Sequence, residues 1–160
     1  MPAMRFPHAG ADIAYAVCGA GPALLLLHGF PQTRAMWNRI APQLAHRFTV
    51  VTPDPRGYGD STAPPGVEAM SFRAMAGDMV ALMRHLGFAE FHVAGHDRGA
   101  RTAHRMALDW PQAVRRLALL DIVPTHALLT DLTHPVARAY YHWFFLAQPA
   151  PLPERMIAAD

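Results

Sequence analysis

The sequence predicts an α/β fold with a mostly parallel β-sheet and crossover helices. Short apolar-rich runs alternate with stretches in which apolar residues recur every three or four positions. Runs such as 23–27 and 48–52 are typical of strands that are buried on both faces, as in a parallel sheet. Strands that alternate with helices favour parallel pairing through crossover connections. We therefore expect a single sheet with helices packed against it.

The first half of the chain is predicted to begin with a β-hairpin over residues 3–18, which breaks at His8–Asp12. Strands are expected at 23–27 and 48–52. Between them, apolar residues at helical spacing predict a helix from Trp37 to His46. The turn-rich segment 54–61 and the prolines after it indicate a long loop with a structural role.

A second helix is expected from Ser71 to Leu86, with Ser71 as its N-cap and Gly87 as its stop. A strand at 91–94 leads into a helix that runs to about Asp109, because Pro111 prevents its continuation. A further strand is expected at 117–120. After Pro124 the chain becomes rich in aromatic residues, with a helix over 136–146 and the first turn of another from Glu154.

Composition limits the class of protein. The chain has 160 residues, 52% hydrophobic and 16% charged, which is typical of a globular protein. Its net charge of +2, without a basic block, gives no indication of nucleic-acid binding. Cys18 is the only cysteine, so no internal disulfide can form, and we expect a buried, inert thiol. The longest aliphatic run is far shorter than the roughly 20 residues that span a bilayer. We expect a soluble, cytoplasmic protein without a membrane partner, metal or cofactor.

The most informative segment is 91–101, which reads as an apolar strand, a tight turn and the start of a helix. Its pattern Gly95-x-Asp97-x-Gly99 is that of a nucleophile elbow with aspartate where serine is usual. The glycines lack Cβ atoms, so the turn can be tight enough to lift Asp97 clear of the sheet. A carboxylate is anionic at neutral pH and needs no base to act as a nucleophile. The alternative interpretation is an ordinary turn aspartate.

Arg98 and Arg101 follow in the first turn of the predicted helix, on one face. Cations there oppose the helix dipole at a cost of roughly 0.3–1 kcal/mol each, whereas an anion held between them would reverse that penalty. Two guanidinium groups can bind a carboxylate with directed hydrogen bonds. The alternative is that both are ordinary solvated helix residues.

Three motifs in chain order carry a resemblance to a known family: His28-Gly-Phe-Pro31, Asp54-x-Arg-Gly-x-Gly-x-Ser61 and the elbow. Together they resemble the α/β-hydrolase superfamily, and the aspartate narrows this to haloalkane dehalogenases, epoxide hydrolases and haloacetate dehalogenases. The first two usually carry Trp after the aspartate, where this chain has Arg98. Segments 95–101, 120–125 and 141–153 look like fluoroacetate dehalogenase.

The resemblance implies a set of roles. Asp97 would attack the halogen-bearing carbon, and Asp121 would orient a catalytic histidine. Arg98 and Arg101 would hold the substrate carboxylate, and His142 and Trp143 would donate to the leaving halide. The backbone N–H groups of Phe30 and Arg98 would form the oxyanion hole, whereas His28 reads as structural. The implied partner is a small haloacid, without cofactor or metal, and the family commonly forms homodimers.

The resemblance covers only about the first half of a family member. Residues 1–125 correspond to the N-terminal part of the hydrolase core, truncated after about the sixth strand, and 126–160 to the start of a helical cap. The general-base histidine would lie later in such a chain, so we expect these 160 residues to trap an ester at most. Two alternatives remain: an epoxide hydrolase, or an inactive remnant that serves as a binding or dimerisation module.

Overall fold

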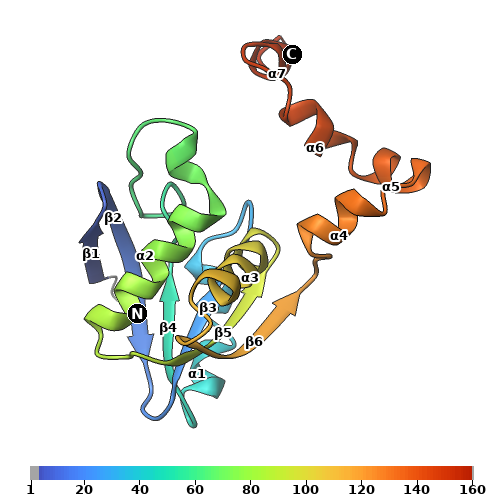
Figure 1. The fold of residues 1–160 in the computed structure, drawn as a ribbon. Coiled ribbons are helices and arrows are strands. Elements are labelled where there is room, and N and C mark those ends of the chain that lie inside the picture. Colours follow the sequence, from blue (N-terminus) through green and yellow to red (C-terminus); the bar gives the residue numbers. More distant parts are fainter. Residues whose placement is uncertain (1–3, 160) are drawn as a thin grey trace. The chain divides into compact units, whose positions relative to one another are not determined.

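The computed structural model describes residues 4–159, in which six strands form one sheet (Figure 1). The strands are β1 (Met4–His8), β2 (Ala11–Cys18), β3 (Ala23–Leu27), β4 (Thr49–Pro53), β5 (Phe91–His96) and β6 (Val114–Leu120). Their order across the sheet is β1-β2-β4-β3-β5-β6. β1 and β2 pair antiparallel with each other, and β2 pairs antiparallel with β4, whereas the pairs from β4 to β6 are parallel. The predicted α/β fold with a mostly parallel sheet is confirmed.

The helices lie between these strands and after them. They are η1 (Arg34–Trp37), α1 (Ala41–Leu44), η2 (Glu68–Met70), α2 (Phe72–His85), α3 (Arg98–Asp109), α4 (Thr125–Thr130), α5 (His134–Ala139), α6 (Tyr141–Leu146) and α7 (Leu152–Ile157). The predicted limits of α2 are confirmed. The Ser71 hydroxyl accepts a hydrogen bond from the Ala74 N–H at 3.2 Å, and Gly87 follows the helix with φ of +87°.

Four features differ from the prediction. The helix expected over 37–46 is a 3-10 turn followed by the short α1, because Pro42 has no N–H to donate across a continuous helix. β6 begins at Val114 rather than at residue 117, because its backbone pairs with β5 although Arg115 and Arg116 are polar. The helix expected over 136–146 is broken at Tyr140, where no Gly or Pro marks the break, and α4 was not expected.

The aliphatic strand β3 is buried on both sides, as its continuous apolar run predicts. Leu25 and Leu27 pack in a core with Met79, Met83 and Met106 of α2 and α3. Leu26 belongs to a second core on the other face of the sheet, which η1 and α1 cover. Figure 1 shows α2 and α3 side by side over one face of the sheet.

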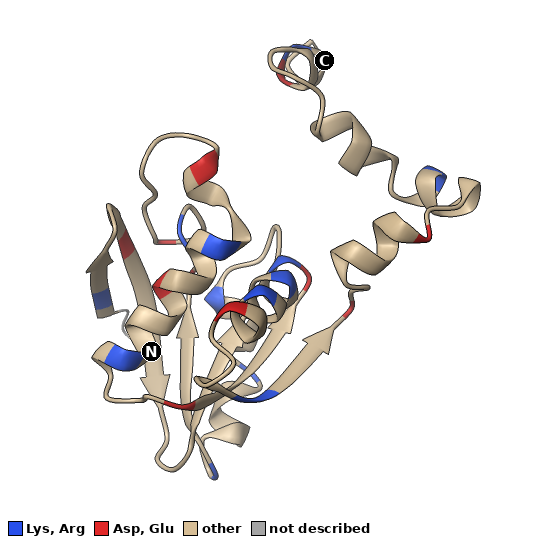
Figure 2. Cartoon of the chain, viewed as in Figure 1, with Lys and Arg blue, Asp and Glu red and all other residues tan. Residues whose placement is uncertain are grey.

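Charged side chains lie outside this sheet centre. β3, β4 and β5 contain no Lys, Arg, Asp or Glu, and Figure 2 shows the charges on helices, loops and outer strands. One ion pair is nevertheless buried. The guanidinium of Arg56 donates twice to the Asp78 carboxylate at 2.6 Å, and so ties the loop after β4 to α2.

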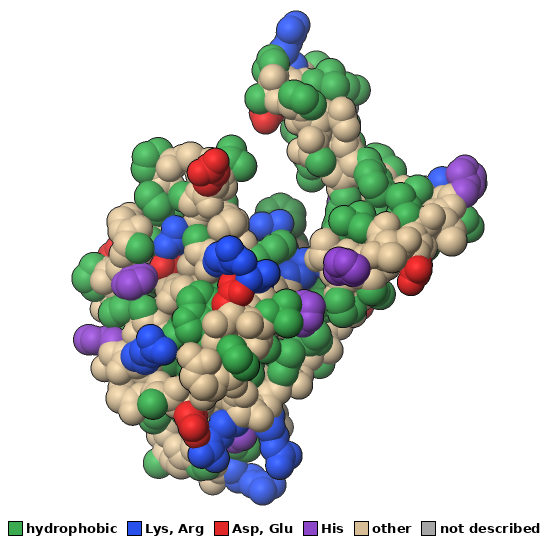
Figure 3. Space-filling view, viewed as in Figure 1, with side chains coloured by type: hydrophobic (Ala, Val, Ile, Leu, Met, Phe, Trp, Pro, Cys, Tyr) green, Lys and Arg blue, Asp and Glu red, His purple; other side chains and the backbone are tan. Residues whose placement is uncertain are grey.

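The chain divides into two compact units, which meet in sequence at Ile122 and Val123. The second unit contains α4 to α7 and has little core of its own, since Leu128 and Pro153 are its buried residues among those described. Large hydrophobic side chains are exposed along its helices, as Figure 3 shows. Across residues 4–159, no helix combines the length and the apolar character needed to span a membrane.

Candidate active site

Asp97 stands at the turn between β5 and α3 in a backbone conformation that is rare for a residue with a side chain. Its φ is +49° and its ψ is −118°. Aspartate at this position of a helix usually accepts a hydrogen bond from the first turn, yet the Asp97 side chain makes no such cap. Strain of this kind persists only where the surrounding structure imposes it and is typical of functional sites. The ordinary turn interpretation of Asp97 is therefore disfavoured.

The glycines of the turn are required by close backbone approach. A Cβ atom on Gly95 would lie 2.6 Å from the amide nitrogen of Ala100, and one on Gly99 would lie 2.6 Å from the carbonyl carbon of Leu27. Both distances are shorter than any real Cβ contact. The tight turn inferred from Gly95-x-Asp97-x-Gly99 is thus present, although neither glycine has a positive φ.

The Asp97 carboxylate faces the loop after β3. The backbone N–H of Phe30 donates to Asp97 Oδ2 at 2.9 Å. Gly29 permits this approach, because a Cβ atom there would lie 2.5 Å from the Asp97 Cβ. The structure therefore places Phe30 next to Asp97, as the sequence predicts. Arg98, the other predicted backbone donor, is the first residue of α3, where an N–H has no acceptor within the helix.

The two predicted carboxylate-binding arginines differ in their surroundings. Arg98 lies with Cζ 4.9 Å from the centre of the Phe72 ring, at the first residue of α2. Its Nε is buried and has no hydrogen-bond acceptor among the described residues. Arg101 is largely buried, with 7% of its surface exposed, and its backbone N–H donates to Asp97 O at 3.1 Å. Both arginines thus lie in the first turn of α3, and Asp97 is the N-cap of this helix.

Asp121 follows β6 at the position that corresponds to Asp97 after β5. His96 pairs with Leu120 across β5 and β6, so Asp97 and Asp121 each follow a paired residue at the same edge of the sheet. The Asp97 N–H donates to Leu120 O at 3.2 Å. Asp121 also has a positive φ, +58°, and its side chain is 86% exposed. Its Oδ2 lies 3.6 Å from His96 Nε2, a contact that the sequence did not indicate.

A buried polar network supports the loop beside Asp97. The Nδ1 of His28 lies 2.8 Å from Gly29 O, and its Nε2 lies 3.2 Å from Asp54 Oδ1, although this second contact falls outside strict hydrogen-bond geometry. The Asp54 carboxylate also accepts from the backbone N–H and the guanidinium of Arg34 and from the Asp60 N–H. The structural interpretation of His28 and of the 54–61 loop agrees with these contacts.

The same network lowers the pKa of Asp54. Burial opposes its charge and would raise the pKa, but the His28 ring, the two backbone N–H groups and the Arg34 charge together lower it to about 2. Asp54 is fully buried. Because its pKa is low, it is an anion inside the protein at neutral pH. We assign it a structural role in shaping the loop that carries Phe30.

The predicted halide donors lie in the second unit. His142 and Trp143 are on α6, and both rings contact Tyr140, with ring centres 6.2 Å and 5.4 Å away. Their halide role stays a prediction.

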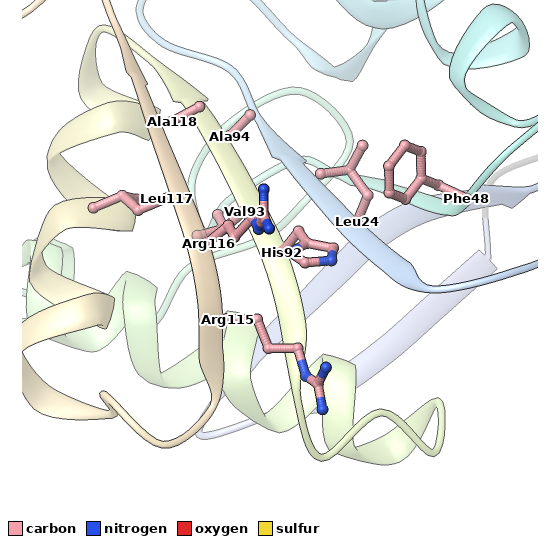
Figure 4. Close-up of a pocket in the computed structure, with 9 residues that line it drawn as sticks. All are labelled: Leu24, Phe48, His92, Val93, Ala94, Arg115, Arg116, Leu117 and Ala118. Carbon is pink, nitrogen blue, oxygen red and sulfur yellow. The ribbon is translucent and has the colours of Figure 1, made fainter.

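A depression also lies elsewhere on the sheet. It measures about 770 Å³ and is lined by Leu24, Phe48, His92–Ala94 and Arg115–Ala118. Figure 4 shows these side chains arising from neighbouring strands, without the elbow residues among them. Within residues 4–159, no three His, Cys, Asp or Glu side chains form a metal-binding group.

Comparison with known proteins agrees with this geometry. Residues 22–159 match the family model described as alpha/beta hydrolase fold. Fluoroacetate dehalogenase from Burkholderia sp. is 59% identical over 90% of this chain and 48% of its own length. Soluble epoxide hydrolase from Corynebacterium sp. strain C12 is 40% identical over 85% of this chain and 47% of its own.

Solved structures give the same result. A proposed α/β hydrolase from Nostoc sp. PCC 7120 superimposes with a TM-score of 0.91 and 52% identity, covering 99% of this chain and 56% of that one. The chain thus spans about half the length of the curated relatives it matches. An aspartate elbow, a parallel sheet and these similarities together establish that the chain belongs to the α/β-hydrolase family.

Proposed function

We propose that this chain carries the nucleophilic half of a haloacetate dehalogenase, the part that forms an ester between substrate and enzyme. The observation that carries the proposal is the Asp97 carboxylate, held at a strained elbow by the Phe30 N–H with two arginines in the helix behind it. The 59% identity to fluoroacetate dehalogenase supports the same reaction class.

In the first step, one oxygen of Asp97 attacks the carbon that bears the halogen. The Phe30 N–H binds Oδ2, which leaves Oδ1 as the attacking atom. A C–O bond forms as the carbon–halogen bond breaks, and the halide leaves with the bonding electron pair. The product is an ester of Asp97 with glycolate, a covalent intermediate. Within this proposal, His142 and Trp143 receive the halide.

In the second step, water attacks the ester carbonyl carbon, and Oδ2 takes the developing negative charge. The N–H of Phe30 is already directed at that oxygen, and the N–H of Arg98 is the second proposed donor. Asp121 would orient the general base that removes the proton of the water. His28 is assigned no such role, because its ring nitrogens face Gly29 O and Asp54. His96, whose Nε2 lies 3.6 Å from Asp121 Oδ2, is not assigned it either, because the resemblance places the general base later in such a chain.

Charge favours an anionic substrate. Arg98 and Arg101 lie in the first turn of α3, where the backbone also presents N–H groups and the positive end of the helix dipole. A substrate carboxylate would compensate this concentration of positive charge. A neutral haloalkane would not.

The proposal predicts a single turnover by the 160-residue chain. Incubation of a Cys18→Ala variant with chloroacetate should attach one carboxymethyl group, which peptide mass spectrometry locates on Asp97, and should release about one chloride per chain. Cys18 is only partly buried, which corrects the expectation of a buried thiol. It is therefore removed as a possible competing nucleophile, although burial raises the pKa of its thiol. The Asp97→Asn variant is the control and should remain unmodified.

Modification spread over other residues, or equal modification of the Asp97→Asn variant, would remove the nucleophile assignment. Sustained chloride release over many turnovers would contradict the limitation to the first step. Arg98→Gln should slow alkylation by chloroacetate by about 10- to 100-fold, since hydrogen bonds to charged groups contribute roughly 1.5–3 kcal/mol.

Epoxide hydrolysis is the second candidate, favoured by the 40% identity to a soluble epoxide hydrolase. It would use the same attack by Asp97, with an acid to protonate the epoxide oxygen. A neutral epoxide should be indifferent to Arg101→Ala, whereas a haloacetate should react more slowly with that variant. Epoxide-derived modification of Asp97 that survives Arg101→Ala would therefore favour this alternative.

A further inference from the structure

Phe72 contacts Arg98, one of the two arginines that are proposed to bind the substrate. It is the first residue of α2, and Arg98 is the first residue of α3. The two helices pack against each other and thus bring the ring under the guanidinium, with Cζ 4.9 Å from the ring centre. This is within the distance at which a cation is attracted by the negative face of an aromatic ring.

The position of Phe72 is itself fixed by local structure. Ser71 precedes it as an N-cap, and its hydroxyl accepts from the Ala74 N–H. The helix therefore begins at a defined residue, and its first side chain has a defined direction. Phe72 is partly buried, so its ring has neighbours that restrict its rotation.

Hydrogen bonding does not orient the inner edge of Arg98. Its Nε is buried without an acceptor among the described residues. The small gap beside it, lined by residues that include His28, Tyr58, Met75 and Thr102, leaves no room for a water molecule. The contact with the Phe72 ring therefore restrains the guanidinium where Nε has no acceptor.

The positive charges around Arg98 give its contact with Phe72 an electrostatic role. A cation at a helix N-terminus is opposed by the helix dipole, and Arg101 adds a second positive charge one turn later. The ring face offers Arg98 a compensating negative potential when no substrate is present. It also restricts a long, flexible side chain, so less conformational entropy is lost when a carboxylate binds.

We propose that Phe72 is a positioning residue, which holds Arg98 ready to bind the substrate carboxylate and so contributes to the preference for anionic over neutral substrates. This inference rests on the proposed function, because it assumes that Arg98 binds the carboxylate. Phe72 itself takes no part in bond making or breaking.

The test compares chloroacetate with its neutral analogue chloroacetamide, in the Cys18→Ala background, by following alkylation of Asp97 at several reagent concentrations. Phe72→Leu should raise the half-saturating concentration of chloroacetate about 3- to 10-fold, the range expected for one cation–π contact. The maximal rate, and the rate with chloroacetamide, should stay within about 2-fold. Phe72→Tyr, which keeps the ring face, should restore the original value.

Phe48→Leu is the matched control, since Phe48 is another partly buried phenylalanine, whose ring contacts His92 rather than an arginine. It should leave all three values unchanged. If Phe72→Leu unfolds the protein, Phe72→Met offers a longer and more adaptable side chain without an aromatic face and should show the same selective effect.

The outcomes separate the two proposals. If Asp97 reacts faster with chloroacetate than with chloroacetamide but Phe72→Leu and Phe72→Met keep that ratio, the inference about Phe72 is overturned and the proposed function stands. Equal loss with both reagents would make Phe72 merely structural and would also overturn the inference. If the unaltered chain does not prefer chloroacetate, or does not react at Asp97, the proposed function itself fails.

Discussion

Gly29 lies against the side chain of Asp97, and its lack of a Cβ atom makes room for the carboxylate. An added Cβ would lie 2.5 Å from the Asp97 Cβ and 2.9 Å from Cγ. Gly29 has no positive φ, so space and not backbone conformation explains the glycine. The residue has no chemistry of its own, yet it determines whether the Asp97 carboxylate can meet the Phe30 N–H.

Gly29→Ala should therefore slow carboxymethylation of Asp97 by about 10- to 100-fold, because small displacements of a reacting group have effects of this size. The measurement is the rate of mass gain with chloroacetate. Gly77→Ala is the control: its nearest neighbour would be the Trp110 ring at 3.8 Å, and it lies within α2. It should leave the rate unchanged and raise the free energy of unfolding by about 0.5–1 kcal/mol. Equal rates for both variants would contradict the packing argument.

Asp54 makes a pH-dependent contribution to the stability of the fold. Its pKa in the folded protein is about 2, below the ordinary value of 3.8. The folded state therefore binds this proton less readily than the unfolded chain does. Asp54 stabilises the fold fully above about pH 4, and this stabilisation is lost as the pH falls from about 4 to about 2.

Asp54→Asn should lower the free energy of unfolding by about 2 kcal/mol or more at pH 7, and the difference from the unaltered chain should shrink towards pH 2. Urea unfolding at a series of pH values measures this. Asp12→Asn, which alters an exposed ion pair with Arg5, should change stability by less than about 1 kcal/mol. A deficit for Asp54→Asn that is equal at pH 7 and pH 2 would refute the pKa argument.

At the scale of elements, β6 has an unusual surface. In the described part of the chain it pairs on one side only, with β5, and most of its residues are exposed. Leu117 and Leu120 are 37% and 43% exposed, and Ala118 lines the large depression beside them. An apolar strand with an unpaired edge is a template for association with another chain.

Leu117→Lys should therefore reduce concentration-dependent association of the 160-residue chain, because a charged side chain discourages pairing at a strand edge. Light scattering over a range of protein concentrations checks this. Leu108→Lys on α3 replaces a leucine that is more exposed, at 61%, but that lies on a helix and not on a strand. If both substitutions reduce association equally, general solubility and not the β6 edge is responsible.

At the scale of the whole molecule, the two units differ in how well each is packed internally. The unit up to Ile122 contains both hydrophobic cores and the turn that carries Asp97. The unit from Val123 consists of helices of six residues each and leaves Tyr141, Leu146 and Ile157 more than half exposed. Helices so short are marginal without tertiary packing. The prediction that a helical cap starts at residue 126 stays a prediction.

Patterns of local origin were predictable. The apolar run of β3 implied burial on both faces, and Leu25 and Leu26 do pack in opposite cores. Ser71 and Gly87 indicated the ends of α2, because caps act within a few residues. Two predicted helices were wrong. One is interrupted before Pro42, which has no N–H to donate, and the other is broken at Tyr140, where no Gly or Pro marks the break.

By itself, the sequence determined the fold class, the elbow with Asp97 at its tip and the family, because these depend on periodicity and on residues close together in the chain. Tertiary structure alone decided that Gly29 makes room for Asp97, that His96 meets Asp121 and that Phe72 lies under Arg98. Each of these contacts joins separate strands, helices or loops. Contacts of this kind depend on how the sheet orders its strands and packs its helices, which no local pattern encodes.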